Sequence, residues 1–290
     1  MSNGGKAMKT SVFTVVMGEF SPEGVAEELG ALGYDGVEWR IHPDFHLHPS
    51  LVDTKSSYLQ GIAQANGLEI PSLGTYVRVG QADDLDRCCR AAAEMGCSQV
   101  RITLDEDYTS DKRFDRMLSE AREGLARVGE TLRRYHVRGL LETHHGSVAE
   151  SASGMRRLLS GFSPEVYGVI FDPANMILAG KESWAMSVDI LGEYLAHVHV
   201  KNISWFTDAD GKWQWRYDTL EGGMVDWPEV IGALQAAGYE GYLSVEDLYG
   251  TSLATTGLAG EAIGGGQPHV STRQKLMQDL AYIKSLMERA

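Results

Sequence analysis

The stretch LAHVHVKNI, residues 195–203, carries His197, His199 and Lys201 at every second position of an otherwise apolar run. Side chains two positions apart on a β-strand point to the same face of the sheet. Two imidazoles and an amine on one face are costly to bury unless each has a partner. Either these residues are satisfied polar groups of the core, or one end of the strand opens into a site.

Three other apolar runs each end in a carboxylate: Glu142 in LLETHHG, Asp172 in IFDPAN and Glu246 in LSVED. For any one of them a structural role, such as pairing with an Arg or a loop amide, is the simpler interpretation. Three carboxylates that face one another repel and shift their pKa values strongly unless a cation lies between them. Together with His199 they form a mostly oxygen-donor set, which favours Mn²⁺, Mg²⁺ or Co²⁺ over a thiolate-type zinc site.

The elements that must bring these residues together are eight short apolar or β-branched runs separated by helical stretches. We expect the strands at residues 11–17, 36–40, 68–74, 98–104, 137–143, 166–172, 196–202 and 241–247. The helix that starts after Ser21 and Pro22 and stops at Gly33 is typical of the intervening segments, and the helix between Asp226 and Gly238 repeats its pattern. Further helices are expected at 111–135 and 271–289.

Strict alternation of strands and helices predicts parallel strands with right-handed crossovers, and eight units predict a single α/β domain of the (β/α)8 TIM-barrel type. The phrases ALGYDGVEW and AAGYEGYLSVE repeat one helix–Gly–strand unit, as a barrel would. No GxGxxG follows the first strand, which argues against a dinucleotide-binding fold. We expect residues 1–9 to form a flexible tail and residues 10–290 the barrel. Two long connections, 203–225 and 248–269, are expected to act as lids or binding loops.

Composition narrows the classes of partner. The chain of 290 residues has a formal net charge of −14, which argues against nucleic-acid binding because that requires clustered Lys and Arg. Three cysteines without a CxxC pair predict buried free thiols in a reducing compartment. The N-terminal segment lacks an apolar signal region and no run is long enough for a membrane span, so we expect a cytoplasmic protein.

The chain resembles the sugar-phosphate isomerase/epimerase superfamily, whose members have a xylose isomerase-like TIM barrel and include ketose 3-epimerases, inosose dehydratases and relatives of endonuclease IV. The phrases that carry this resemblance are GVEW, LLETHHG, IFDPANMILAG, HVHVKN and EGGMVDWPEVIGALQAAGYEGYLSVE. It implies that one divalent metal ion is held at the strand ends, Mn²⁺ by preference, with Mg²⁺, Co²⁺ or Zn²⁺ as alternatives. The implied metal ligands are Glu142, Asp172, His199 and Glu246.

The resemblance also implies an activity: isomerisation or epimerisation of a small ketose or polyol ketone through a metal-stabilised enediolate. Glu142 and Glu246 would be the catalytic acid and base, with Lys201 interacting with a substrate oxygen. An inosose-dehydratase-like lyase with Lys201 as general acid is the alternative. A DNA-repair endonuclease and a sugar-binding barrel without catalysis are the weaker hypotheses. Members of the family suggest a homodimer or homotetramer.

Several positions depart from the family pattern. The strand-7 His is followed by VKNISW, where the ketose 3-epimerases have a Gly-Glu pair and a substrate-gripping Arg, and Asn202 stands where related enzymes continue with Asp. Asn175 replaces a His that many members place three residues after the strand-6 Asp, and His145 is expected to face away from the mouth. The residues expected to contact substrate are His144, Asn175, Glu38, Arg101 and Trp205, although Glu38 and Arg101 could instead pair with each other in the core.

Overall fold

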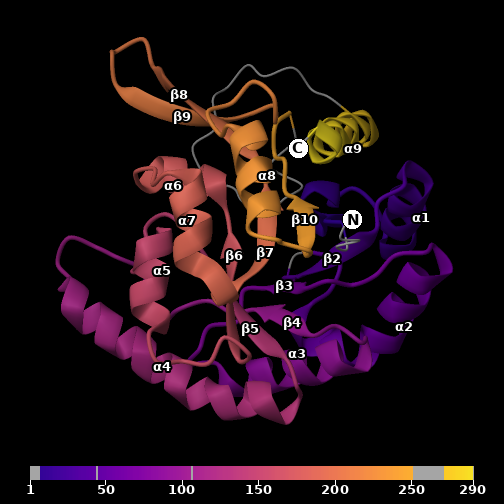
Figure 1. Ribbon diagram of the computed structural model, residues 1–290. Coiled ribbons are helices and arrows are strands. Elements are labelled where there is room, and N and C mark those ends of the chain that lie inside the picture. Colours follow the sequence, from indigo (N-terminus) through magenta and orange to yellow (C-terminus); the bar gives the residue numbers. More distant parts are fainter. Residues whose placement is uncertain (1–6, 44, 106, 251–270, 290) are drawn as a thin grey trace, which may run out of the picture.

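Eight parallel strands close into a barrel in the computed structural model, which describes residues 7–43, 45–105, 107–250 and 271–289 (Figure 1). Around the barrel the strands follow the order β1-β10-β7-β6-β5-β4-β3-β2, so each strand except at the closure lies beside its neighbour in the chain. This confirms the predicted (β/α)8 fold. The barrel strands are β1 (Lys9–Phe13), β2 (Gly36–Ile41), β3 (Leu73–Thr75), β4 (Gln99–Arg101), β5 (Arg138–Glu142), β6 (Tyr167–Phe171), β7 (Leu195–Val200) and β10 (Tyr242–Val245).

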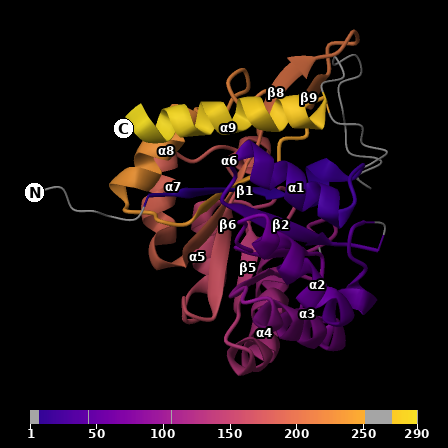
Figure 2. The same ribbon diagram turned by 90° about the vertical axis from the view of Figure 1, so that its right-hand side faces the viewer.

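The helices surround the barrel, and α9 runs along its outside between α1 and α8 (Figure 2). Helix α1 starts where expected, because the Ser21 side chain accepts a hydrogen bond from the Gly24 amide, and it ends at Gly33 with φ of 86°. The α-helices are α1 (Pro22–Leu32), α2 (Val52–Ala65), α3 (Ala82–Glu94), α4 (Phe114–Arg134), α5 (Ala152–Leu159), α6 (Pro173–Ala179), α7 (Trp184–Leu191), α8 (Trp227–Ala236) and α9 (Thr272–Arg289), and the 3₁₀ segments are η1 (Thr14–Met17), η2 (Pro49–Leu51) and η3 (Gly192–Tyr194).

Three predicted strands have clearly different bounds in the structure, and one of them, β4, covers only residues 99–101 of the expected 98–104. The first strand ends at Phe13, and residues 14–17 form η1 instead of continuing it. The third strand is limited to residues 73–75 because Pro71 has no amide hydrogen for the ladder. The predicted tail over residues 1–9 falls mostly outside the described residues, and Lys9 already belongs to β1.

The expectation that 203–225 is a loop was wrong. It contains an antiparallel hairpin, β8 (Asn202–Thr207) and β9 (Trp213–Asp218), which projects from the barrel at the upper left of Figure 1. Alternating aromatic and polar residues on both sides of a Gly-containing turn suit such a hairpin. From residue 251 on, the second expected loop, 248–269, lies outside the described residues.

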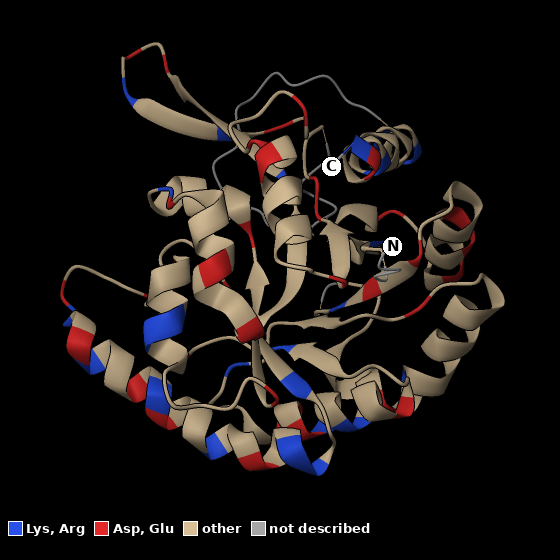
Figure 3. Ribbon diagram, viewed as in Figure 1, with Lys and Arg blue, Asp and Glu red and all other residues tan. Residues whose placement is uncertain are grey.

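The placement of charged residues and of the three cysteines agrees with what the composition predicts. Blue and red segments are interspersed along α4 on the outside of the barrel (Figure 3). Cys88, Cys89 and Cys97 are buried free thiols, as predicted, and burial raises the pKa of each to about 12. Across the described residues no helix combines the length and apolarity needed to cross a membrane.

Gly74 on β3 has no room for a side chain, because a Cβ there would overlap the ring of Phe13. That ring is fully buried and stacks on His199, with centroids 5.4 Å apart. We therefore expect Gly74→Ala to destabilise the protein by about 1–3 kcal/mol, measured by urea denaturation. Gly61→Ala on α2, where nothing lies within 4 Å, is the control and should leave stability equal or higher. Equal stability of both variants would contradict this account.

Two buried charged residues of helix α9, Lys275 and Asp279, lie near Asp247, just after the end of β10. Asp279 is 6% exposed, and its Oδ2 has no hydrogen-bond partner among the described residues. Lys275 donates to the backbone oxygens of Asp247 and Tyr249. Burial and the neighbouring Asp247 carboxylate raise the pKa of Asp279 well above its ordinary value, although Lys275 acts in the other direction. Ionised Asp279 is therefore a source of instability.

Asp279→Asn is expected to stabilise the protein at pH 8 by on the order of 1 kcal/mol and to give no gain at pH 4. The folded-state pKa of Asp279 lies above the unfolded value, so the unfavourable ionisation is absent below the unfolded pKa and grows as pH rises. Urea denaturation at the two pH values measures the difference. Asp210→Asn, at an exposed position, serves as the control, and an equal gain at both pH values would contradict the assignment.

Candidate metal centre

The structure brings four residues predicted as metal ligands to one point at the carboxyl ends of the barrel strands. Glu142 is the last residue of β5, Asp172 and Glu246 directly follow β6 and β10, and His199 lies near the end of β7. One ligand atom from each of the four lies within 4.8 Å of the others. Asp172 and His199 are fully buried, and Glu142 and Glu246 are 8% and 7% exposed. The barrel therefore holds a compact cluster of three carboxylates and an imidazole.

Asp172 is held by the start of helix α6. It is the N-cap of that helix, and its Oδ1 accepts a hydrogen bond of 3.0 Å from the backbone amide of Asn175. The side-chain Nδ2 of Asn175 also donates to Asp172 Oδ2 at 2.9 Å and to Glu142 Oε1 at 3.1 Å. Asn175 thus ties two carboxylates of the cluster together.

Lys201 reaches into the cluster. Its Nζ lies 2.7 Å from Asp172 Oδ2, 2.8 Å from Glu246 Oε2 and 3.9 Å from Glu142 Oε1, and the residue is 5% exposed. Strand alternation led us to place this amine one layer above His199. In the structure the chain leaves β7 at Val200, and the lysine side chain turns toward the carboxylates. Lys201 is therefore positioned to act on the same atoms as the cluster.

Arg101 pairs with Glu142. Its Nη2 lies 2.7 Å from Glu142 Oε2, and its guanidinium lies over the ring of Tyr76, 4.8 Å from the centroid. Burial alone would raise the pKa of Glu142, but Arg101 and His199 hold that pKa well below its ordinary value. Glu142 is consequently an ionised carboxylate at neutral pH.

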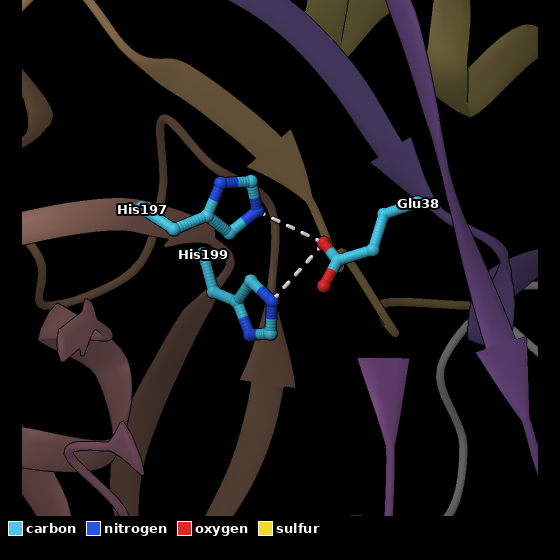
Figure 4. Close-up of side chains that lie close together, drawn as sticks. All are labelled: Glu38, His197 and His199. Atoms are coloured by element: carbon cyan, nitrogen blue, oxygen red, sulfur yellow. Dashed lines mark hydrogen bonds and ion pairs between the residues drawn. The ribbon is translucent and has the colours of Figure 1, made fainter. Parts of the chain in front are cut away.

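Glu38 lies one layer below the cluster and binds the two histidines of β7 (Figure 4). Its Oε2 is 3.0 Å from His197 Nε2 and 3.3 Å from His199 Nε2, and it accepts a hydrogen bond of 2.7 Å from Ser244 Oγ. Glu38 is fully buried, which differs from the mouth position expected of a substrate contact. The suggested pairing of Glu38 with Arg101 is not made, and His197 is a core histidine with a partner.

The other carboxylates of the cluster have divergent pKa values. Burial raises the pKa of Asp172 to about 6, with Glu142 and Glu246 adding to the rise and Lys201 opposing it. Burial acts in the same direction on Glu246, but Lys201 and His199 lower its pKa to about 2. Such divergent pKa values are expected where several buried acids share few neighbouring positive charges.

The two cationic side chains show the complementary effect. Burial disfavours the charged form of Lys201, but Asp172 and Glu246 hold its pKa well above the ordinary value. Burial acts likewise on His199, and Glu38 and Glu246 raise its pKa well above the ordinary value. The carboxylates of the cluster therefore stabilise the protonated forms of Lys201 and His199.

Of the remaining predicted substrate contacts, His144 lies beside His145, and Trp205 lies opposite Trp215 in the hairpin. His144 stacks on His145 with centroids 4.5 Å apart, and His145 Nδ1 is 3.4 Å from Asn175 Oδ1. Trp205 on β8 pairs with Trp215 on β9, and it is Trp215 whose ring meets His145 at 6.2 Å. His145 was expected to face away, but β5 ends at Glu142, so alternation no longer applies to it. Only the Trp-rich composition of 203–225 hinted at Trp215.

The strands form a closed parallel barrel, and its acidic and imidazole side chains gather at the carboxyl ends of the strands. This arrangement defines the class of protein as a (β/α)8 barrel with a site in the usual position for this architecture. The chain belongs to the xylose isomerase-like TIM barrel family, whose model matches residues 26–268.

Individual relatives are distant. Over 156 residues the chain is 23% identical to the inosose dehydratase of Lacticaseibacillus casei, and this match covers 49% of this chain and 49% of the relative. The chain thus spans about half the length of the curated relative that it matches.

Solved structures match over nearly the whole chain. D-psicose 3-epimerase with D-tagatose from Clostridium cellulolyticum H10 has a TM-score of 0.73 at 15% identity, covering 97% of this chain and 99% of that one. The probable 3-DHS dehydratase AsbF from Bacillus anthracis has a TM-score of 0.71 at 17% identity, covering 98% and 100%. At these identities the likeness establishes the fold.

Proposed function

We propose that the protein is a divalent-metal-dependent isomerase or epimerase that moves a proton at the carbon next to the carbonyl group of a small ketose or polyol ketone. The observation that carries the proposal is the cluster of Glu142, Asp172, His199 and Glu246, with ligand atoms within 4.8 Å of one another. Relatives named as an inosose dehydratase and a ketose 3-epimerase support a sugar-modifying enzyme.

The residues of the cluster fit a divalent cation by their chemistry. Three buried carboxylates and one imidazole supply mainly hard donors, which suits Mn²⁺ first, with Mg²⁺, Co²⁺ or Zn²⁺ as alternatives. Burial, together with Glu142 and Glu246, raises the pKa of Asp172 to about 6, and a bound cation would stabilise its ionised form. When bound, such a cation would stabilise the negative charge that develops on the substrate oxygens during proton abstraction.

Glu142 and Glu246 have the properties of the two proton-transfer groups. They project from β5 and β10, which are separated by β6 and β7 around the barrel, so they can approach a substrate from different sides. Both have lowered pKa values and are ionised at neutral pH. One would remove the proton from the substrate carbon, and the other, once protonated, would return a proton to the opposite face.

A lyase of the inosose-dehydratase type is the second candidate. The observation that favours it is the position of Lys201, whose ammonium group lies within 2.8 Å of both Asp172 and Glu246. An ammonium at that place could protonate a departing β-hydroxyl group after the same proton abstraction. The relatives named as dehydratases are consistent with this alternative.

The test is proton exchange in D₂O. Protein loaded with Mn²⁺ and a chelator-treated sample are incubated with a panel of ketoses and inososes, and carbon-bound deuterium is followed by NMR. Incorporation that depends on the metal would support the proposal, and the product, an epimer or a dehydrated ketone, would decide between isomerase and lyase. Absence of exchange on every compound would exclude the proposed activity for that panel.

A further inference from the structure

His199 has a carboxylate near each of its two ring nitrogens, and Figure 4 shows Glu38 beside Nε2. Its Nδ1 lies 3.3 Å from Glu142 Oε1 and 3.2 Å from Glu246 Oε2, inside the candidate metal centre. Its Nε2 lies 3.3 Å from Glu38 Oε2, below the centre. The same imidazole therefore belongs to two clusters, one with the proposed metal ligands and one with Glu38 and His197.

We propose that Glu38 is a positioning residue, which fixes the ring of His199 so that Nδ1 presents its lone pair to the proposed metal ion. The inference rests on the proposed function. A metal ion at Nδ1 would require the neutral ring with its one hydrogen on Nε2, and the Glu38 carboxylate would accept that hydrogen. Histidines that bind metals commonly donate their second ring hydrogen to such a partner, and the loss of that partner weakens metal binding.

The geometry around Glu38 suits this role better than contact with substrate. Glu38 has no exposed surface, and its Oε2 is shared by His197, His199 and the Ser244 hydroxyl. Ser244 on β10 lies directly beside His199 in the strand register, so neighbouring strands fix both groups. A carboxylate held this way keeps its place while the residues above it bind ligands.

The plane of the His199 ring is fixed independently. The ring of Phe13 stacks on it at an interplanar angle of 16° and a centroid distance of 5.4 Å. Phe13 restricts tilting of the imidazole, but an apolar ring cannot select which nitrogen carries the hydrogen. In the part of the chain that the structure describes, Glu38 is the carboxylate that contacts Nε2, so it favours a hydrogen on that nitrogen.

Mn²⁺ affinity, measured by isothermal titration calorimetry, tests the inference with Glu38→Ala, Glu38→Gln and a control, Ser187→Ala. Glu38→Ala is expected to weaken Mn²⁺ binding by about 10–100-fold. Glu38→Gln should recover part of the loss, because its amide oxygen can still accept the Nε2 hydrogen. Ser187→Ala removes a fully buried hydroxyl on α7 that has no hydrogen-bond partner among the described residues, and its affinity should stay within about threefold of the wild type.

A second measurement reports on the nitrogen itself. The ¹⁵N chemical shifts of His199 in the Zn²⁺-loaded wild type should show a protonated Nε2 and a metal-bound Nδ1, and Glu38→Ala should lose this single pattern. Urea denaturation in the presence of a chelator checks that every variant folds. Unchanged affinity and ¹⁵N shifts in Glu38→Ala would overturn the inference, as would an equal loss of affinity in Ser187→Ala. A wild type that binds neither metal would instead overturn the proposed function, and the inference with it.

Discussion

A Glu246→Gln protein is expected to lose metal-dependent deuterium incorporation by about 10²–10⁴-fold while remaining folded. Glutamine keeps the size and shape of the side chain, but it can neither accept a proton at neutral pH nor supply negative charge to a cation. Glu246 contacts both Lys201 and His199, so its replacement also removes one of the anions that organise the cluster. The rate of exchange into the best ketose of the panel is the measurement.

Glu240→Gln is the matched control, because Glu240 is an exposed glutamate just before the same strand. Its exchange rate should equal that of the wild type. Mn²⁺ titration of Glu246→Gln separates two causes, since loss of a ligand weakens binding and loss of a base alone does not. An exchange rate within threefold of the wild type would show that Glu246 is neither ligand nor base.

Much of the barrel could be predicted because its pattern is local. Most strands are short apolar runs, and helices α1 and α8 have recognisable starts at Ser21 and Asp226. The hairpin at 203–225 escaped prediction because its strands are half exposed and rich in aromatic residues, which resemble a binding loop in sequence. The contacts that the Trp side chains of this hairpin make depend on packing between segments far apart in the sequence, which no local pattern encodes.

The four residues of the cluster could be placed from the sequence for a physical reason. A strand that ends in a carboxylate after apolar residues can point that group only into the barrel or toward the helices, and the barrel rule selects the mouth. Glu142, Asp172 and Glu246 all obey it. Their roles as metal ligands remain predictions, since position alone does not show that an ion binds.

The partners of the charged residues were not predictable in the same way. Glu38 and Arg101 both face the lumen, and alternation cannot say that one reaches His199 while the other reaches Glu142. The barrel's radius and the lengths of the two side chains decide this. Lys201 shows the same limit, because alternation places it on the same face as His199 but cannot say that its amine reaches Asp172 and Glu246.

Lys201→Met is expected to make the stability of the protein depend on a divalent cation. The Lys201 ammonium lies 2.7 Å from Asp172 and 2.8 Å from Glu246 and is 5% exposed, so it compensates buried negative charge. Removing one partner of a buried ion pair costs about 3–5 kcal/mol. In the presence of a chelator the variant should lose stability by that order, measured by urea denaturation.

Saturating Mn²⁺ should restore much of this stability, because a ligand that binds only the folded state adds about 4 kcal/mol at 1,000 times its Kd. The cation takes over the charge compensation that Lys201 provided, so Mn²⁺ should stabilise the variant more than it stabilises the wild type. Lys55→Met, at an exposed position on α2, is the control and should behave as the wild type. A Lys201→Met protein that is destabilised in chelator and gains nothing from Mn²⁺ would show that the three carboxylates do not form a cation site. A variant as stable as the wild type in chelator would show instead that Lys201 does not compensate their charge.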